Sequence, residues 1–254
     1  MPLILLTNDD GYDAPGLQLL ADAVADLGQV WMIAPHIERS ACGRSVTLDR
    51  PLRVEQRGEN RLAVDGTPAD CVLLGLRALL PAAPELVVSG INRGYNLGED
   101  LDYSGTVAGA AEGALQGAGA SMAISVGADS PPAVFERAAA VARGLALMLV
   151  EQPLPRGCYL NVNLPADATD RVRWTRQGNP LAPGTVDRGR DPRGKPYYWI
   201  ANRPDEDDPP PDTDRGAVAR GVISITPMTL DRTFRASWNA PDLGRTGLRL
   251  EPAE

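Results

Sequence analysis

The chain has 254 residues and a formal net charge of −8, and 43% of its residues are hydrophobic. This hydrophobic share is typical of a globular protein and argues against wholesale disorder. The length suits one domain, or one domain with an appendage. The negative charge argues against a protein that coats nucleic-acid polymers, because such binding needs clustered Lys and Arg. Small phosphorylated ligands remain compatible with it, since a bound divalent cation supplies positive charge locally.

The N-terminal apolar stretch and the few cysteines bear on location. Residues 2–6 are apolar, but a membrane span needs ~20 such residues, and no basic leader precedes them. The three cysteines are an odd number at wide spacings, which fits reduced thiols better than a disulfide framework. We therefore expect a cytoplasmic protein that does not enter a membrane. The single histidine, His36, cannot build a His-rich zinc site.

The first half of the chain alternates short apolar runs with helical periodicity. Apolar runs of strand length predict strands at residues 3–7, 30–34, 52–56, 62–65, 86–89 and 122–126. Apolar residues three and four apart predict helices at residues 17–27, 71–80, 107–116 and 134–149, the first of them ended by Gly28. Repeated strand–helix units with unalternated apolar strands indicate an α/β fold, with a parallel sheet covered by helices on both faces. Ligands of such folds bind at the edge formed by the C-terminal ends of the strands.

The pattern changes after residue 152. Residues 159–164 predict one more strand of the main sheet, and strand-like pieces follow at residues 172–175, 197–200 and 217–226. Residues 205–212 are acidic and Pro-rich, which predicts an exposed loop. We therefore divide the chain into a main domain at residues 1–168 and a β-rich extension at residues 169–254. Such extensions commonly pack on another subunit, so we expect an oligomer.

Two adjacent carboxylates, Asp9 and Asp10, follow the first predicted strand. Neighbouring carboxylates repel each other unless something cationic bridges them. Hard oxygen donors of this kind suit Mg²⁺ or Mn²⁺ better than zinc. The alternative is a helix-entry turn, since Asp and Asn cap helices and favour turns. The motif alone does not separate a metal site from such a turn.

Two further polar loops are expected after strands on the same edge. Residues 34–47 contain Ser40 among small residues, and the alternative to a ligand loop there is a flexible connection. Residues 89–98 contain three glycines, which allow close approach to a ligand. Their two asparagines, Asn92 and Asn96, carry groups that bind a metal or a phosphate. The alternative for this loop is a Gly-rich turn without a ligand.

The fourth polar loop, residues 102–106, opens a predicted helix. Free amides at a helix N-terminus, together with the positive end of the helix dipole, form an anion site, and Ser104 and Thr106 add hydroxyls. An ordinary helix cap, worth ~1 kcal/mol, is the alternative, and the two interpretations are compatible. Together the four loops predict metal-assisted phosphoryl transfer to water. Neither GxxxxGK[ST] nor an early GxGxxG is present, which disfavours ATPases and dinucleotide-binding proteins.

These motifs resemble the stationary-phase survival protein family usually called SurE, the 5′/3′-nucleotidases. The resemblance rests on LLTNDDGYDAPG, RSACGRSVTL, GTPADC, SGIN and NLG, YSGTVAGAAEG, NVNLP and DRGAVARGVISITPM, in chain order. It implies a Rossmann-like, doubly wound α/β domain and a hairpin and C-terminal arm exchanged between protomers of a homodimer or homotetramer. It also implies hydrolysis of nucleoside 5′- and 3′-monophosphates with one divalent cation per subunit, broad specificity and some action on polyphosphate.

The resemblance assigns roles by motif position. The family's metal ligands match four positions of this chain: Asp9, Asp10, Ser40 and Asn92. Its phosphate-binding residues match four others: Asn96, Ser104, Gly105 and Thr106. One departure is His36, where the family usually carries Asp.

Two hydrolytic routes are open at this stage. In one, Asp9 or Asp10 assists the in-line attack of water as a base, and in the other an aspartate attacks phosphorus and forms a phosphoenzyme. A non-catalytic nucleotide-sensing domain is the alternative function. An interaction scaffold is a third, but a scaffold gives no reason for four ligand-binding loops on one edge.

Overall fold

The computed structural model describes residues 1–167, 170–178, 185–201 and 208–233, and its centre is one nine-stranded sheet. In spatial order the strands are β3 (Val54–Gly58), β4 (Arg61–Val64), β2 (Gln29–Pro35), β1 (Leu3–Thr7), β5 (Leu86–Arg93), β6 (Ala120–Val126), β7 (Cys158–Leu164), β11 (Ile223–Thr229) and β8 (Val172–Trp174). The strands from β4 to β7 in this order run parallel. Strand β3 is antiparallel to β4, and β11 and β8 run opposite to β7. The expected α/β class with a mostly parallel sheet is confirmed.

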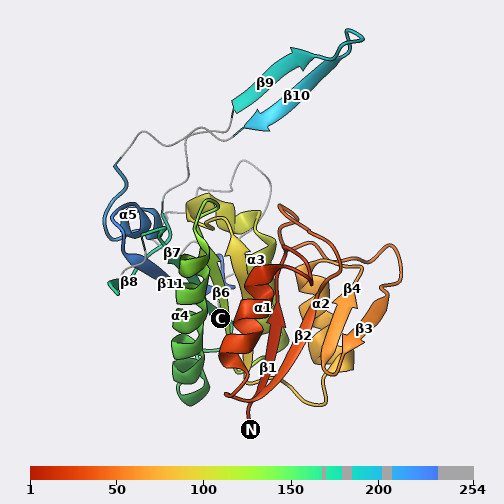
Figure 1. Ribbon diagram of the computed structural model, residues 1–254, viewed down its shortest axis with the longest axis vertical. Coiled ribbons are helices and arrows are strands. Elements are labelled where there is room, and N and C mark those ends of the chain that lie inside the picture. The colour runs from red at the N-terminus through yellow and green to blue at the C-terminus, as the bar shows by residue number, and fades with distance from the viewer. Residues whose placement is uncertain (168–169, 179–184, 202–207, 234–254) are drawn as a thin grey trace, which may run out of the picture.

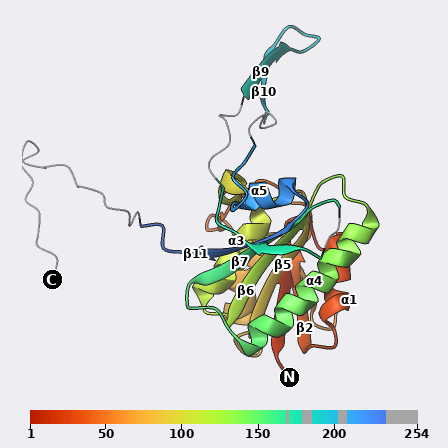
Figure 2. The same cartoon turned by 90° about the vertical axis from the view of Figure 1, so that its left-hand side faces the viewer.

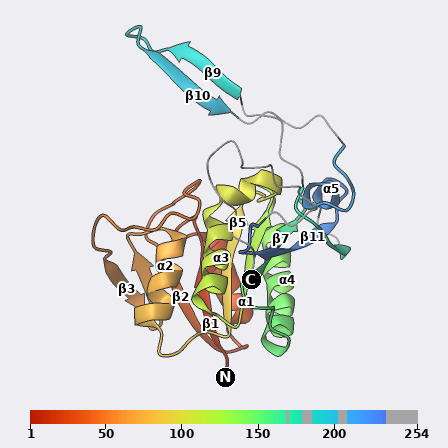
Figure 3. The ribbon, with the colours of Figure 1, turned by 180° about the vertical axis from the view of Figure 1, so that it is seen from behind.

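Helices cover both faces of the sheet. The helices are α1 (Pro15–Val24), α2 (Pro68–Leu74), α3 (Gly105–Gln116), α4 (Pro132–Glu151) and α5 (Asp214–Ala219), with a π-helical turn at Gly75–Leu79 and a 3₁₀ turn at Gly98–Asp102. Helices α1 and α4 pack together on one face (Figure 1), and α2 and α3 on the other (Figure 3). Within the described residues, no helix combines the length and apolarity that a bilayer span requires.

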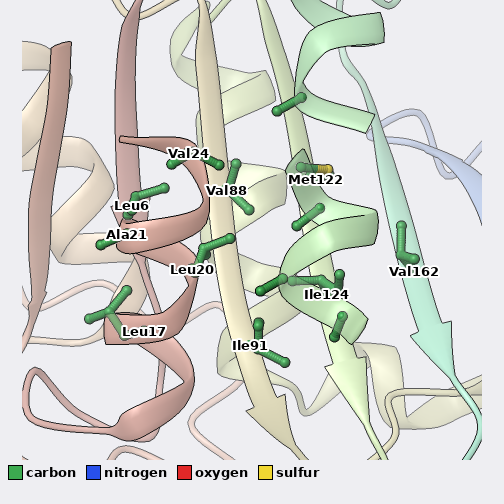
Figure 4. Close-up of a cluster of buried hydrophobic side chains, with 14 of the residues drawn as sticks. Leu6, Leu17, Leu20, Ala21, Val24, Val88, Ile91, Met122, Ile124 and Val162 are labelled. Atoms are coloured by element: carbon green, nitrogen blue, oxygen red, sulfur yellow. The ribbon is translucent and has the colours of Figure 1, made fainter. Parts of the chain in front are cut away.

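The largest apolar cluster lies between the sheet and the α1–α4 layer (Figure 4). Leu17, Leu20 and Val24 form one stripe of α1 and are fully buried. They pack on the strands that contribute Leu6 and Val88. All five residues of β1 are buried, because helices cover both of its faces. This two-sided burial explains why the strand is apolar throughout and shows no alternation.

Three element boundaries near the predicted loops differ from expectation. Helix α1 ends at Val24, not at Gly28. Strand β3 begins two residues later than expected. Strand β5 continues to Arg93, so the first half of the predicted loop at residues 89–98 belongs to the strand. Its pairing with β6 is irregular between Ser89 and Asn92, which is why the apolar run stops before the strand does.

The strand expected at residues 217–226 was wrong in its first part. The chain instead forms the short helix α5 and then enters β11 at Ile223. Thr213 caps α5, because its side chain accepts a hydrogen bond from the Gly216 amide. Gly221 has a φ of +67°, which separates the helix from the strand. The short apolar pattern did not distinguish one helical turn from a strand.

The region expected to form the extension divides into two parts. Strands β8 and β11 belong to the main sheet. Strands β9 (Thr185–Arg190) and β10 (Pro196–Ala201) form an antiparallel hairpin that stands away from the body (Figures 1 and 2). Only β10 was predicted, because β9 has few apolar residues. Residues 234–254 and residues 205–207 of the acidic loop lie outside the described residues, while Asp208 and residues 210–212 are exposed, as expected. The exchanged C-terminal arm and the division at residue 168 stay predictions.

Candidate active site at the C-terminal edge of the sheet

Asp9 is the side chain on which three segments meet. It lies two residues after the end of β1, and only 5% of its surface is exposed. Its carboxylate accepts a hydrogen bond from the Thr106 hydroxyl at the start of α3. Its carbonyl oxygen accepts the Arg39 amide at 2.7 Å, which brings in the loop after β2. At Gly105 a Cβ atom would lie 2.9 Å from Asp9 Oδ2, so only glycine leaves room for the carboxylate there.

The first turn of α3 stabilises the charge on Asp9. Burial raises the pKa of Asp9, and hydrogen bonds from the Thr106 hydroxyl and from the Thr106 and Gly105 amides oppose that rise. Amides in the first turn of a helix have no acceptor within the helix. The anion that meets this helix N-terminus is therefore Asp9 itself.

Asp10 is half-buried beside the same cluster. Burial raises its pKa to about 6, and the neighbouring charges of Asp9 and Glu38 add to the rise. The Arg93 amide donates to Asp10 Oδ2 at 3.3 Å and partly opposes it. Two acidic side chains with raised pKa values lie side by side at a free-energy cost. A divalent cation between them would remove that cost, so the donor chemistry fits such an ion.

The two other predicted metal ligands lie on segments that touch the aspartates. Ser40 is exposed after β2 and donates its hydroxyl proton to Glu38 at 2.6 Å, which leaves the oxygen lone pairs for a ligand. Asn92 lies near the end of β5 and donates its Nδ2 to the Gly94 carbonyl at 2.8 Å. If Asn92 binds the predicted metal, its side-chain Oδ1 would be the ligating atom, because Nδ2 is a donor. The neighbours Arg39 and Arg93 contact the aspartates directly.

Glu38 was missed at the sequence level. It adds an acidic group beside Asp10, and the only signal was a carboxylate two residues before Ser40. In the part of the chain that the structure describes, no group of three or more His, Cys, Asp or Glu side chains has the arrangement of a metal site. The predicted metal ligands include only two side chains of these types, Asp9 and Asp10, because the other two are a hydroxyl and an amide.

The turn after β1 is packed against the loop after β2. Asn8 Nδ2 donates to the Gly11 carbonyl at 2.9 Å and closes the turn around the aspartates. Gly11 has a φ of +102°, and a Cβ atom there would lie 3.2 Å from the Ile37 backbone. Next to it, the Tyr12 amide donates to the Pro35 carbonyl at 2.7 Å. These contacts fix the loop that carries Ser40 relative to Asp9.

Asp70, in the GTPADC motif, anchors the far end of the same loop. It is fully buried and accepts both the amide and the hydroxyl of Thr47, at 2.9 and 2.6 Å. It also completes a capping box with Thr67 at the start of α2. Between these anchors the Gly43 amide donates to the Tyr103 carbonyl at 2.8 Å. Sequence reasoning missed this role, although Thr-x-x-Asp before an apolar run is a capping signal.

The predicted phosphate-binding residues take two different positions. Ser104 is the N-cap of α3 and accepts the Val107 amide at 3.1 Å, so the ordinary cap expected as an alternative is present. Gly105 and Thr106 lie against Asp9, as described above. Asn96 is buried, and its Nδ2 donates inward to Ser125 Oγ at 2.8 Å. The structure thus gathers three of the four residues around Asp9, and their contact with phosphate stays a prediction.

Two buried asparagines of β7 hold the backbone of Asn96. Asn161 and Asn163 each donate Nδ2 to the Asn96 carbonyl at 2.9 Å, and Asn163 Oδ1 accepts the Asn96 amide at 2.9 Å. A fully buried amide side chain is costly unless it is hydrogen-bonded, and these three bonds offset that cost. Sequence reasoning missed both residues. The signal was the pair of asparagines inside the apolar strand NVNLP.

The fold and the site define an α/β protein that gathers carboxylates, a hydroxyl, amides and a helix N-terminus at one edge of a parallel sheet. That class of site suits a phosphorylated ligand bound with a divalent cation. Residues 4–182 match the family model described as Survival protein SurE. The chain belongs to the SurE family.

Curated and solved relatives agree with this assignment. The chain is 49% identical over 239 residues to a protein named 5′-nucleotidase SurE from Desulforudis audaxviator, covering 91% of this chain and 92% of that one. It is 48% identical over 237 residues to the protein of the same name from Geotalea daltonii, covering 91% and 94%. The solved SurE protein from Aquifex aeolicus superposes with a TM-score of 0.78 at 40% identity, covering 91% of this chain and 95% of that one.

Proposed function

We propose that this chain is a divalent-metal-dependent phosphomonoesterase that hydrolyses nucleoside 5′-monophosphates to nucleoside and phosphate. The observation that carries the proposal is the contact of Asp9 with the first turn of α3, with Asp10 beside it. The name 5′-nucleotidase of relatives nearly half identical over nine-tenths of the chain supports the substrate class. By family resemblance the proposal extends to nucleoside 3′-monophosphates and to polyphosphate.

The proposed cofactor is one Mg²⁺ or Mn²⁺ ion per subunit. Its ligands would be the oxygens of four side chains: Asp9, Asp10, Ser40 and Asn92. Such hard oxygen donors suit these ions. When bound, the ion would polarise a phosphate oxygen and neutralise the charge that develops as the ester bond breaks.

The side chains of the protein would orient the metal ligands and accept the proton of the attacking water. Thr106 and the first amides of α3 hold Asp9 in one orientation. Asp10, beside Asp9, would be the base that accepts a proton from attacking water. The competing route is direct attack by an aspartate oxygen on phosphorus. The stereochemistry at phosphorus, followed with an isotopically chiral phosphate ester, distinguishes the routes, because direct attack by water inverts the configuration and two displacements through a phosphoenzyme retain it.

The deciding experiment is phosphate release from AMP, GMP and p-nitrophenyl phosphate, measured with Mg²⁺, with Mn²⁺ and with excess chelator. We expect release with either metal and none in chelator. Undiminished release in chelator would contradict the metal-dependent mechanism. Tight AMP binding without release under any metal would favour the nucleotide-sensing alternative.

We also propose that the protein is a homodimer or homotetramer in which the β9–β10 hairpin is exchanged between protomers. The hairpin exposes a set of large apolar side chains: Val186, Tyr197, Tyr198, Trp199 and Ile200. A two-stranded hairpin is marginally stable alone, and exposed apolar groups of this size are typical of interfaces. The proposed location is the cytoplasm, which suits the three free cysteines.

A further inference from the structure

Gly98 ends the loop at residues 92–98, called the site loop below, which carries Asn92 and Asn96. Both polar groups of the Gly98 backbone are bonded to residues of the C-terminal region. Its amide donates to Asp214 Oδ2 at 2.9 Å, and its carbonyl accepts Gln177 Nε2 at 2.7 Å. Its φ of +57° is one that L side chains rarely adopt. The end of the site loop is therefore held from outside the parallel core of the sheet.

Asp214 is fully buried, and its carboxylate accepts three backbone amides. Besides Gly98, these belong to Gly178 at 2.9 Å and Arg215 at 2.7 Å, both bonded to Oδ1. A buried carboxylate is costly unless its oxygens are hydrogen-bonded. Capping α5 does not account for Asp214, because Thr213 already caps that helix. The bond from Oδ2 to Gly98, 116 positions away, is the one that reaches the site.

The residues that hold Gly98 lie at the two ends of residues 176–214, which contain β9 and β10 and are called the hairpin-bearing segment below. Gln177 and Gly178 precede β9, and Asp214 follows β10. The two ends are also joined to each other, since Arg176 pairs with Asp212 at 2.7 Å and the Asp214 amide donates to the Arg176 carbonyl at 2.9 Å. The segment is thus closed at its base, and this base bonds Gly98.

Besides the Gly94 amide, which donates to the Val126 carbonyl at 2.9 Å, the C-terminal half of the site loop is held at two points of different origin. Asn161 and Asn163 of the main sheet hold Asn96, and the base of the hairpin-bearing segment holds Gly98. Only one residue, Leu97, lies between the two points. A displacement of the base would therefore be transmitted to Asn96 and, through the short loop, to Asn92.

We propose that Asp214, assisted by Gln177, is a positioning residue for the site loop. It makes the metal and phosphate affinity of the site depend on the base of the hairpin-bearing segment. The inference rests on the proposed function, because that function supplies the role of the loop.

The test uses Asp214→Asn in the full-length protein. The asparagine oxygen keeps the two donors Gly178 and Arg215, so its NH₂ group faces the Gly98 amide, and donor opposes donor. The loop contact is lost while the fold of the C-terminal region is kept. Isothermal titration of the chelator-treated protein should show Mn²⁺ affinity weakened roughly tenfold, the scale for loss of a group that supports metal ligands. The KM for AMP should rise more than kcat falls.

Gln177→Ala is the second variant, because Gln177 is exposed and its loss removes only the bond to the Gly98 carbonyl. We expect the same changes at smaller size. Asp170→Asn is the matched control, since this exposed aspartate of the C-terminal region pairs with Arg137 of α4 and bonds neither the base of the hairpin-bearing segment nor the site loop in the structure. Its Mn²⁺ affinity and KM should equal those of the wild type.

Hydrogen exchange of residues 94–98 gives a readout that does not depend on activity. Faster exchange there in Asp214→Asn and Gln177→Ala, with no change in Asp170→Asn, supports the positioning role even if the wild type hydrolyses nothing, in which case only the proposed function fails. Wild-type exchange, Mn²⁺ affinity and KM in the two variants would overturn the inference, as would equal effects in the control. If Asp214→Asn does not fold, Gln177→Ala decides.

Discussion

The turn after β1 and the β9–β10 hairpin have opposite environments, because the turn buries charged side chains and the hairpin exposes apolar ones. In the turn, two carboxylates are withdrawn from water, with raised pKa values and few groups to offset their charge. In the hairpin, large apolar side chains stand in water, with Trp199 68% exposed. Burial of charge and exposure of apolar surface both cost free energy until a partner is supplied. The two proposed partners, a cation for the turn and a second protein chain for the hairpin, would remove these two costs.

The largest effect is expected for Asp9→Asn, which removes the charged group that the α3 N-terminus holds. We expect kcat/KM for AMP to fall by roughly 10²–10³-fold, the range for loss of one preorganised charge-stabilising group. Phosphate release measures the loss, and circular dichroism should show an unchanged fold. Asp13→Asn, at an exposed position four residues along the same turn, is the matched control and should keep full activity. Full activity of the Asp9→Asn variant would show that this turn is not part of the active site.

The hairpin should respond through assembly. Replacing Tyr198 and Trp199 together by Ser removes two exposed aromatic anchors, and we expect the subunit dissociation constant to rise by roughly 10–100-fold. Sedimentation velocity over a concentration series measures it, with the 27.0 kDa chain mass marking the monomer. Arg188→Ser in β9, a polar change on the same hairpin, is the control. A wild type that is already monomeric would contradict the need for a protein partner.

The smallest effect is expected on the free energy of unfolding of the metal-free protein, and it arises from the titration of Asp10. Its folded pKa of about 6 lies above the ordinary 3.8, so the folded state binds the proton more tightly. The free energy of unfolding of the metal-free protein should therefore fall as the pH rises from about 4 to about 6. Asp10→Asn should reduce this fall, leaving the contribution of Asp9, and should stabilise the metal-free protein at pH 7 by about 1–2 kcal/mol. Thermal unfolding at pH 5 and pH 7 measures both effects, and Mn²⁺ should reverse the order of the two proteins at pH 7. A variant less stable than wild type at pH 7 without metal would contradict this.

Local sequence determined the class of fold and the place of the site. The run at residues 3–7 was recognisable as a strand because helices bury both of its faces, and burial on both faces excludes polar residues. The aspartates were recognisable because they end that run, where the chain must turn at the edge of the sheet. Residues 217–219 failed as a prediction because one turn of helix and a strand share the same short apolar pattern.

Tertiary structure alone decided how the site is held. The Thr106 hydroxyl on Asp9 spans 97 positions, and the Gly98 amide on Asp214 spans 116. Such bonds leave no local pattern, because a buried polar group needs a partner in space and the sequence does not say which one. The sequence by itself determined that acidic, amide and hydroxyl groups gather at the C-terminal edge of a parallel sheet. The packing of the chain decided which polar side chains, like Asn163 and Asp214, hold the backbone of the loop that carries the proposed ligand Asn92.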